Sequence, residues 1–450
     1  MNYSTMSRPE LTQLCKTRKI RGYSGKKRGD MIALLQGIIE EKVVESEEKE
    51  KETIVEKAIK SEEKAIKSVE KAIEDKNTFV FQTMLTCIGN KRKLVHHIRN
   101  IVDDVRTTLS KEKLNIVDGF AGSSVVSREL SYVADRLYTN DLELYSYLMA
   151  HCYLVVPTAE QRSQITTHIV AMNCIAERGP YIEGTICAMY APKVTKSIQE
   201  GERCFYTREN ALVLDTLRQY IADHVDPLLV PYCLVPLLNK ASIHTNTAGV
   251  FKGFYKKGSV GCFGGNAECA LSRIMKPIRL DIPVWNLESD YTSIPSNMEI
   301  LERVNTLPDD IDIMYLDPPY NQHPYGSNYF MLNVLAKHEM PQAVSKVSGI
   351  PTDWNKSDFN THTKAIESMK QLLQVGLQRS AYLLISYNHE GIIETDEWTT
   401  LLLPYRVKKY EIPYDTYKGS RNLKERTSAG LGINGQGDKV MEVMYLISNR

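Results

Sequence analysis

Residues 311–320 read Ile-Asp-Ile-Met-Tyr-Leu-Asp-Pro-Pro-Tyr, an apolar run of strand length that stops at two consecutive prolines. Because proline fixes φ and donates no backbone hydrogen bond, we expect Pro318 and Pro319 to leave the sheet as a stiff loop. Asp317 stands just before this break and Tyr320 just after it. A carboxylate and a backbone carbonyl beside an aromatic ring suit the exocyclic amine of a flipped-out adenine. An ordinary strand end is the alternative, since paired prolines usually mark no more than a turn.

A second motif lies in residues 115–126, where an apolar segment runs through small side chains into a helix-like stretch. Small residues let a ligand approach the backbone, and a helix start offers free N–H groups. A later strand-like segment ends at Asp141, whose carboxylate could accept hydrogen bonds from ribose hydroxyls. A glycine-rich turn alone could equally be structural, but the two segments together predict a nucleoside-cofactor pocket. The predicted lining of this loop is Asp118, Phe120, Ala121, Gly122 and Ser123.

Basic residues gather upstream of this loop, in the segment Ile-Gly-Asn-Lys-Arg-Lys-Leu that precedes a predicted helix. One interpretation is a basic helix start on the surface. The other is a lid that contacts the carboxylate of the cofactor through Lys91 and the loop backbone. The residues of this predicted lid are Ile88, Gly89, Asn90 and Lys91.

The elements that must position these groups follow an α/β pattern. Strand-like runs at 114–118, 136–140, 311–316 and 381–387 are separated by helical stretches, which predicts an α/β fold. Residues 440–447, Val-Met-Glu-Val-Met-Tyr-Leu-Ile, look like a closing edge strand.

The N-terminal residues 1–40 have a different composition. Two short helices, 9–17 and 26–39, are expected around a turn that contains two glycines. Basic residues near the second helix start could bind phosphates, whereas the alternative is a helical hairpin with a solvated charged rim. The order of helix, Gly-Tyr-Ser-Gly-Lys-Lys turn and helix resembles a SAP domain, a small helical DNA-binding fold. The basic residues are Lys26, Lys27 and Arg28.

Residues 41–77 are mostly charged, with both signs interspersed. Ile59, Ile66 and Ile73 recur every seven residues on one helical stripe. Glu62 occupies a seam position, however, and three heptads are marginal for a coiled coil. We therefore expect a charged helical linker rather than a dimerising coiled coil, and a monomer or weak dimer.

Bulk composition limits the class of protein. The chain of 450 residues is 42% apolar and carries a formal net charge of +1, so it can bury one large domain plus an appendage. Nine cysteines are scattered without paired spacing, which argues against disulfides and a zinc site. The sequence shows no apolar leader and no run of membrane-spanning length. We expect a soluble intracellular protein without a metal.

Taken in order, the motifs resemble the alpha-class adenine-N6 DNA methyltransferases, which accompany restriction systems in bacteria and in large viruses of algae and protists. The likeness covers essentially residues 79–450. It rests on Ile-Gly-Asn-Lys-Arg-Lys-Leu, Phe-Ala-Gly-Ser-Ser, Asn-Asp-Leu-Glu-Leu-Tyr-Ser-Tyr and Asp-Pro-Pro-Tyr, and extends to Asn210 and to residues 246–251, 325–330, 385–388 and 414–422. One departure is Ser124, where many relatives carry the second glycine of the cofactor loop.

The resemblance implies a Rossmann-like methyltransferase domain at 78–450 that uses S-adenosylmethionine, with an inserted target-recognition region at about 157–284. Phe120, Ala121 and Gly122 would form the cofactor loop. Asp141 would bind the ribose, and Asp290 the amino group of the cofactor adenine. Double-stranded DNA would be the substrate, and a cognate restriction endonuclease could be a partner. The protein would act on DNA in the cytoplasm or nucleus, or in a virus-infected cell.

The resemblance also implies a mechanism. Adenine N6 would donate hydrogen bonds to Asp317 and the Pro318 carbonyl, which localises its lone pair for in-line attack on the sulfonium methyl group. Tyr320 would stack on the base, with Tyr414 or Tyr417 as the opposite wall. Polar and basic side chains in the target-recognition region and after residue 417 suit contacts with DNA phosphates and base edges, whereas a solvated surface is the alternative. These residues are Lys240, His244, Asn246, Lys252, Lys256, Lys257, Lys418 and Arg421.

Three rival functions remain open from the sequence. An N4-cytosine methyltransferase would need similar acceptors, but those relatives usually carry Ser at position 317. A protein-glutamine or RNA methyltransferase would more often carry Asn there. A catalytically silent DNA-binding protein would not need an intact Asp317, Pro318 and Tyr320.

Overall fold

The computed structural model describes residues 3–17, 20, 23–36, 76–81, 85, 89–265, 268–414 and 440–450. The chain divides into two compact units, Met1–Ile66 and Lys67–Arg450. The predicted linker at 41–77 lies outside the described residues except for its last two.

The smaller unit is built from a short 3₁₀ turn, Tyr3–Thr5, helix α1, Arg8–Thr17, and a second helical segment at 28–36. Leu11 and Cys15, four residues apart on α1, pack against Met31 and Leu35 of the second segment, and all four are buried. This spacing gives each helix one apolar face. The turn between them contains Gly25, whose φ of +84° favours glycine.

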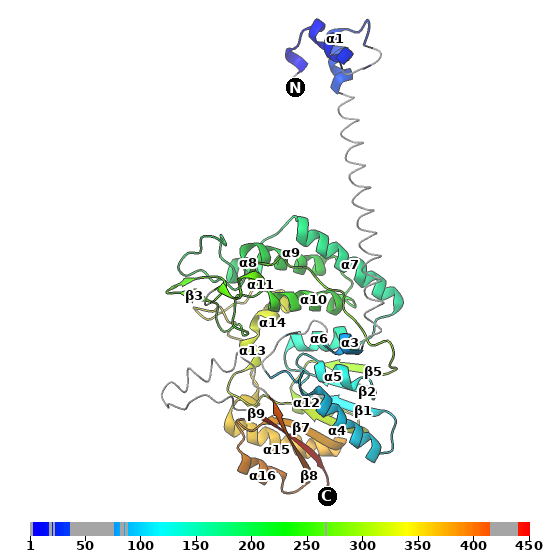
Figure 1. Cartoon of the computed structure of the whole chain (residues 1–450), viewed down its shortest axis with the longest axis vertical. Helices are drawn as coiled ribbons and strands as arrows, with labels where there is room; N and C mark the ends of the chain where they lie inside the picture. Colours follow the sequence, from blue (N-terminus) through cyan, green and yellow to red (C-terminus); the bar gives the residue numbers. More distant parts are fainter. Residues whose placement is uncertain are drawn as a thin grey trace. The chain divides into compact units, whose positions relative to one another are not determined.

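A seven-stranded sheet forms the centre of the larger unit, in the order β5-β2-β1-β6-β7-β9-β8 (Figure 1). The first five strands of this order are parallel, whereas β9 runs antiparallel to both β7 and β8. This mostly parallel sheet confirms the predicted α/β class and is consistent with a Rossmann-like methyltransferase. The strands are β1 Leu114–Asp118, β2 Ala134–Asn140, β5 Thr292–Ser296, β6 Ile311–Leu316, β7 Ser380–Asn388, β8 Arg406–Tyr414 and β9 Val440–Ser448.

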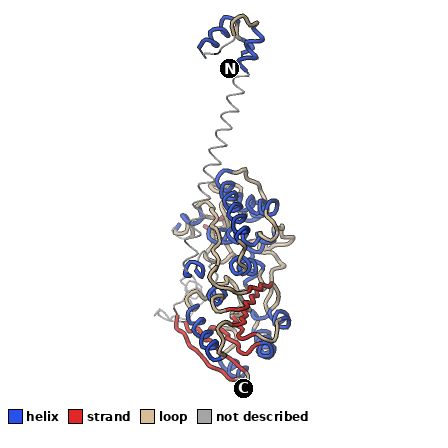
Figure 2. The backbone as a smooth tube through the Cα atoms, turned by 90° about the vertical axis from the view of Figure 1, so that its right-hand side faces the viewer, coloured by secondary structure: helices blue, strands red, loops and turns tan. Residues whose placement is uncertain are grey.

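Successive residues of the central strands enter opposite cores, because side chains alternate across a strand. Ile116 packs with α4 (Val95–Thr108) and α5 (Val125–Leu130). Its neighbour Val117 packs with α12 (Ile300–Thr306) and α15 (His362–Arg379) on the other side. Both faces of the sheet are therefore covered by helices, as Figure 2 shows.

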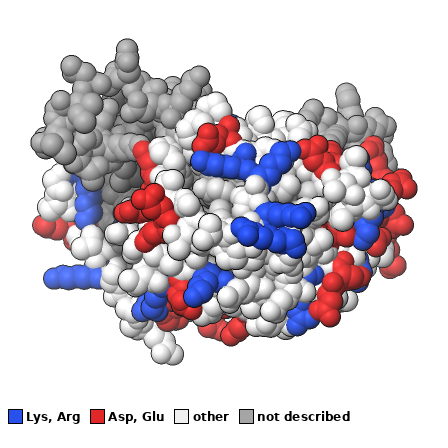
Figure 3. Space-filling model, turned by 90° about the horizontal axis from the view of Figure 1, so that it is seen from below, with Lys and Arg blue, Asp and Glu red and all other residues white. Residues whose placement is uncertain are grey.

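One strand prediction was wrong. Residues 440–447 were expected to close the sheet, but β9 lies between β7 and β8, and β8 forms the edge. Lys408, Lys409 and Pro413 give β8 the charged and proline-containing sequence typical of an edge strand. Lysine and arginine side chains are interspersed with acidic ones on the face of the molecule seen in Figure 3.

A helical layer lies between β2 and β5 in the sequence (Figure 1) and contributes most of a third large apolar core. Its helices are α6 Leu144–Leu154, α7 Ala159–Arg178, α8 Thr185–Tyr190, α9 Arg208–His224, α10 Val230–Ile243 and α11 Leu271–Met275, and its hairpin is β3 Lys256–Lys257 with β4 Val260–Gly261. The remaining elements of the unit are α3 Lys76–Phe81, α13 Tyr325–Asn328, α14 Phe330–Lys337, η3 Asp358–Asn360 and α16 Thr395–Leu402. In the described part of the chain, no helix is long and apolar enough to cross a membrane.

Candidate active site

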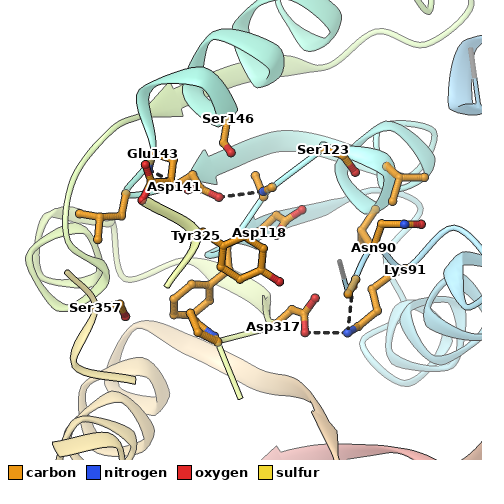
Figure 4. Close-up of a pocket in the computed structure, with 18 of the residues that line it drawn as sticks. Asn90, Lys91, Asp118, Ser123, Asp141, Glu143, Ser146, Asp317, Tyr325 and Ser357 are labelled. Carbon is orange, nitrogen blue, oxygen red and sulfur yellow. Dashed lines mark hydrogen bonds and ion pairs between the residues drawn. The ribbon is translucent and has the colours of Figure 1, made fainter. Parts of the chain in front are cut away.

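A pocket opens at the carboxyl ends of β1, β2 and β6, where parallel strands bring their last residues to one edge of the sheet. Asp118 ends β1, Asp141 follows β2, and Asp317 follows β6. Figure 4 shows all three side chains within this pocket. The predicted residues that line it are Gly89, Asn90, Lys91, Asp118, Phe120, Ala121, Gly122, Ser123, Asp141, Asp317 and Pro319.

Asp141 fixes the loop that follows β1. Its Oδ2 accepts a hydrogen bond from the Gly122 backbone N–H at 2.8 Å, and its Oδ1 accepts one from the Glu143 N–H at 2.9 Å. Gly122 has a φ of +51°, which favours glycine. A Cβ added there would meet only the Phe120 carbonyl oxygen, at 4.0 Å, so the space beside this loop is open. The backbone can therefore approach a bound ligand closely.

Ser124 has a φ of +61°, a conformation that costs a non-glycine residue about 1–2 kcal/mol. Its side chain is fully buried, and among the described residues its hydroxyl has no hydrogen-bond partner. We expect Ser124→Gly to increase the free energy of unfolding by about 1 kcal/mol, measured by urea denaturation.

Ser123→Gly, the adjacent change, has no positive φ to relieve. It should lower the free energy of unfolding by roughly 0.5–1 kcal/mol through the added freedom of the unfolded chain. Equal destabilisation by the two substitutions would show that Ser124 stores no strain.

Besides Asp317, three carboxyl groups in the pocket have raised pKa values and so hold protons more tightly than usual. Burial raises the pKa of Asp118 to about 7, although Ser127 donates a hydrogen bond to it. Burial likewise raises the pKa of Asp141 to about 6, and burial together with the Asp141 charge raises that of Glu143 to about 7. Asp118 Oδ1 has no hydrogen-bond partner among the described residues. This acidic lining suits a ligand that carries positive charge.

Lys91 pairs with the first residue of the Asp-Pro-Pro-Tyr loop. Its Nζ is 2.8 Å from Asp317 Oδ1 and 3.0 Å from Glu442 Oε1. Burial alone would lower the pKa of Lys91, but attraction to the two carboxylates raises it well above its ordinary value. The ammonium group is thus committed to these partners, which disfavours the predicted contact between Lys91 and a cofactor carboxylate. Figure 4 shows Lys91 directed at Asp317.

Aromatic rings lie near Lys91 and in the lining of the pocket. The ring centroid of Tyr320 lies 5.7 Å from Lys91 Nζ and 6.2 Å from the edge-on ring of Tyr387. The Ile392 N–H donates to the Tyr320 carbonyl at 2.9 Å, which holds the end of the proline loop in place. Tyr325 also lines the pocket and stacks on Tyr329 with 19° between the ring planes.

Asp290 is not part of this pocket, so its predicted contact with the cofactor adenine was wrong. It precedes β5, and the amino end of a parallel strand lies at the opposite sheet edge from the pocket. The Asp290 carbonyl accepts a hydrogen bond from Lys113, which precedes β1 at the same edge.

The prediction that Asn246 contacts DNA was also wrong, because its side chain is fully buried. Its amide group donates to the carbonyls of Cys204 and Cys262 and accepts from the Gly264 N–H, so it fixes a loop. His244 is also buried, with Nδ1 2.8 Å from the Arg273 carbonyl oxygen.

Several predicted residues lie outside the described part of the chain, namely Ile88, Tyr417, Lys418, Arg421 and the side chain of Tyr414. Lys252 and Lys256 are exposed, as are Lys257 and Lys27. Lys240 instead pairs with Asp281 at 2.7 Å.

Sequence reasoning missed several lining or supporting groups, among them Glu143, Tyr325 and Glu442. Glu143 could have been found, because it follows Asp141 by two residues. Tyr325 stands in a stretch that the resemblance covers, without a signal for its role. Glu442 interrupts the apolar run Val-Met-Glu-Val-Met, and a lone carboxylate in a strand that reads as buried was the available signal.

Comparison with known proteins places this geometry in a family. Residues 88–400 match the family described as D12 class N6 adenine-specific DNA methyltransferase. The chain belongs to this family. The match begins at the predicted lid and includes the loop after β1 and the Asp-Pro-Pro-Tyr loop, whereas Glu442 lies beyond it.

The D12-class chain is also similar to three modification enzymes. It is 27% identical to modification methylase StsI of Streptococcus sanguinis over 75% of this chain and 49% of that protein. It is 27% identical to the type II methyltransferase M.CviAII of Paramecium bursaria Chlorella virus 1, over 71% of this chain and 87% of the relative. It is 24% identical to the type II methyltransferase M.NlaIII of Neisseria lactamica, over 74% of this chain and 91% of the relative. The matched region thus spans about half of StsI and most of the other two.

Proposed function

We propose that this D12-class protein is a site-specific DNA methyltransferase that transfers a methyl group from S-adenosylmethionine to N6 of an adenine flipped out of double-stranded DNA. The observation that carries the proposal is the position of Asp317, at the end of β6 and in the same pocket as the Gly122 loop. This arrangement sets a hydrogen-bond acceptor for an amine beside a space suited to a nucleoside.

The pocket fits S-adenosylmethionine, which supplies an electrophilic methyl group on a positively charged sulfur. Phe120, Ala121 and Gly122 would border the nucleoside, and the open space beside Gly122 supports this placement. Asp118 and Asp141 would accept hydrogen bonds and attract the positive charge; one buried Asp118 oxygen has no partner among the described residues.

Asp317 and the Pro318 carbonyl would orient the base. Hydrogen bonds donated by adenine N6 to these two acceptors localise the nitrogen lone pair and aim it at the methyl carbon. Tyr320 would stack on the flipped base, at an unstacking cost of a few kcal/mol for the duplex. The opposite wall would come from Tyr414 or Tyr417.

The raised carboxyl pKa values predict that cofactor binding depends on pH. Below about pH 6–7, Asp118, Asp141 and Glu143 take up protons and lose their attraction for a cation. The dissociation constant of S-adenosylmethionine should therefore rise as the pH falls, and that of the uncharged-sulfur product S-adenosylhomocysteine should rise less. Isothermal titration calorimetry across this range measures both. Asp118→Asn should reduce the difference between the two ligands in the pH dependence of the dissociation constant. Identical pH profiles for the two ligands in the wild type would contradict the electrostatic explanation.

Contacts with DNA are proposed for the exposed Lys252 and Lys256. Lys276 and Arg279 are further exposed cations that border a hollow with Lys240 and Asp281. Each lost phosphate contact should reduce the slope of log affinity against log salt by about one.

Lys252→Ala with Lys256→Ala should thus weaken duplex binding and make it less dependent on salt, as measured by fluorescence anisotropy. Lys408→Ala, an exposed lysine on the edge strand β8, is the control and should leave the slope unchanged. An unchanged slope in the double variant would remove these lysines from the DNA interface.

The smaller unit is proposed to be a SAP-like DNA-binding module that the charged linker tethers. Arg28 donates to the Met6 carbonyl at 2.9 Å, and the Lys26 carbonyl accepts from Arg8, so these two residues also support the unit. Lys27 is exposed and would contact phosphates. A restriction endonuclease of the same specificity would be a functional partner, and the chain itself would be a monomer or weak dimer.

The experiment is modification-aware long-read sequencing of DNA from a bacterial host that lacks adenine methylation and expresses the full chain. N6-methyladenine at one short motif, absent when Asp317→Ala is expressed instead, is the expected result. Folded protein without methylated adenine would overturn the proposal.

A further inference from the structure

Glu442 is a buried carboxylate that pairs with Lys91, the partner of Asp317, although it lies far from both residues in the sequence. Its side chain is 1% exposed and that of Lys91 is 5% exposed, and their charged atoms are 3.0 Å apart. Ser386 of β7 donates a hydrogen bond to the same oxygen, Glu442 Oε1. Strand pairing sets this contact, since β9 runs antiparallel to β7 with Glu442 opposite Asn388.

The charge of Glu442 needs an explanation. Burying a carboxylate costs several kcal/mol, and an apolar residue of similar volume usually serves stability equally well. The neighbours of Glu442 in β9 are apolar, and one of them, Met444, belongs to the same apolar core as Ile116. Because Lys91 lies between Glu442 and Asp317, the three groups carry one excess negative charge when all are ionised.

We infer that Glu442 is a positioning residue for methyl transfer, which shares Lys91 with Asp317 and so keeps the Asp317 carboxylate both fixed and basic. This inference rests on the proposed role of Asp317. With Glu442 ionised, Lys91 divides its attraction between two partners. Without that charge, Lys91 would pair with Asp317 alone and make it a weaker acceptor for the amine.

The proton balance of the reaction makes this basicity useful. As the bond between N6 and the methyl carbon forms, the bond between that carbon and sulfur breaks, and its electron pair stays on sulfur. N6 then carries a positive charge and must release one proton. Asp317 is the acceptor already hydrogen-bonded to N6, so the proton passes to its carboxylate and from there to solvent.

The other groups around Asp317 also affect its charge. They are Lys91 from the loop before α4, Glu442 from β9, Asp118 from β1, Tyr315 from β6 and Tyr320 from the proline loop. Burial raises the pKa of Asp317 to about 6, Lys91 lowers it and Glu442 raises it. Removing the Glu442 charge should therefore lower the pKa of Asp317.

The test is the rate of a single turnover of methyl transfer, measured with the full chain, saturating S-adenosylmethionine and duplex DNA across pH. In Glu442→Gln the midpoint of the acidic limb should move to lower pH by roughly one unit. The plateau rate should fall several-fold, and the dissociation constant of S-adenosylmethionine should stay the same. Glu442→Asp retains the charge and should keep the wild-type midpoint.

The matched control is Glu411→Gln. Glu411 is an exposed residue of β8 that lies opposite Val443 and pairs with Lys409. This substitution should change neither the midpoint nor the plateau. An unshifted midpoint in folded Glu442→Gln would overturn the inference. If that variant does not fold, Ser386→Ala replaces it, and an unchanged plateau rate there would overturn the inference as well. A wild-type chain that methylates no DNA would instead count against the proposed function.

Discussion

Replacing Asp317 by alanine is expected to lower the single-turnover rate of methyl transfer by about 10²–10⁴-fold. The variant loses the acceptor that orients adenine N6 and takes up its proton. Binding of S-adenosylmethionine should persist, because the Gly122 loop is held by Asp141 and not by Asp317. Rapid-quench measurement of labelled methyl incorporation gives the rate, and calorimetry gives the cofactor affinity.

Asp309→Ala is the control for this change. Asp309 is exposed before the start of β6 and pairs with Arg379, away from the pocket. Its rate should match that of the wild type. An Asp317→Ala variant that kept its fold and a rate within threefold of the wild type, about 0.7 kcal/mol in the barrier, would refute the assigned chemistry.

Lys91→Met should produce the largest loss of stability. The substitution leaves the buried Glu442 and the partly buried Asp317 without their cation, and breaking a buried pair in this way costs about 3–5 kcal/mol. The pKa of Asp317, already raised to about 6 by burial, should rise further once Lys91 no longer lowers it. Methyl transfer should also be lost, because a protonated Asp317 is a poor acceptor.

The loss of stability should depend on pH. A carboxyl group whose pKa is higher in the folded than in the unfolded protein stabilises the fold at low pH and loses that contribution as the pH rises through the folded pKa. Lys91→Met should thus differ less from the wild type near pH 5 than near pH 8 in urea denaturation. Lys93→Met, at an exposed position in the same segment, should cost little at either pH. A deficit independent of pH would mean that the carboxylates do not depend on Lys91.

Local sequence patterns predicted the central strands well. The runs at 114–118 and 311–316 match β1 and β6 residue for residue, because both are apolar segments bounded by polar turns. The edge strand β8 was missed, since Arg-Val-Lys-Lys-Tyr-Glu is as rich in charged residues as a solvated loop. Local sequence patterns could not predict the strand order either, because β9 lies between β7 and β8 through pairings between distant segments.

The site was predictable where motif and strand end coincide. Asp118, Asp141 and Asp317 each follow or end a parallel strand, so their convergence follows from topology. The predicted role of Asp290 was wrong because a residue that precedes a parallel strand lies at the amino end of the sheet, opposite the pocket. Asn246 failed because polarity alone does not distinguish a surface amide from one that satisfies buried carbonyls. Glu442 could not be assigned a partner, since Lys91 is brought to it only by the register of β9 on β7.

Methylation of adenine at N6 by this pocket can be measured directly. Purified chain would be incubated with S-adenosylmethionine and unmethylated duplex DNA, and the digested nucleosides would be identified by mass spectrometry. We expect N6-methyldeoxyadenosine with the wild type and none with Asp317→Ala. N4-methyldeoxycytidine, or no methylated nucleoside from folded protein that binds the cofactor, would contradict it.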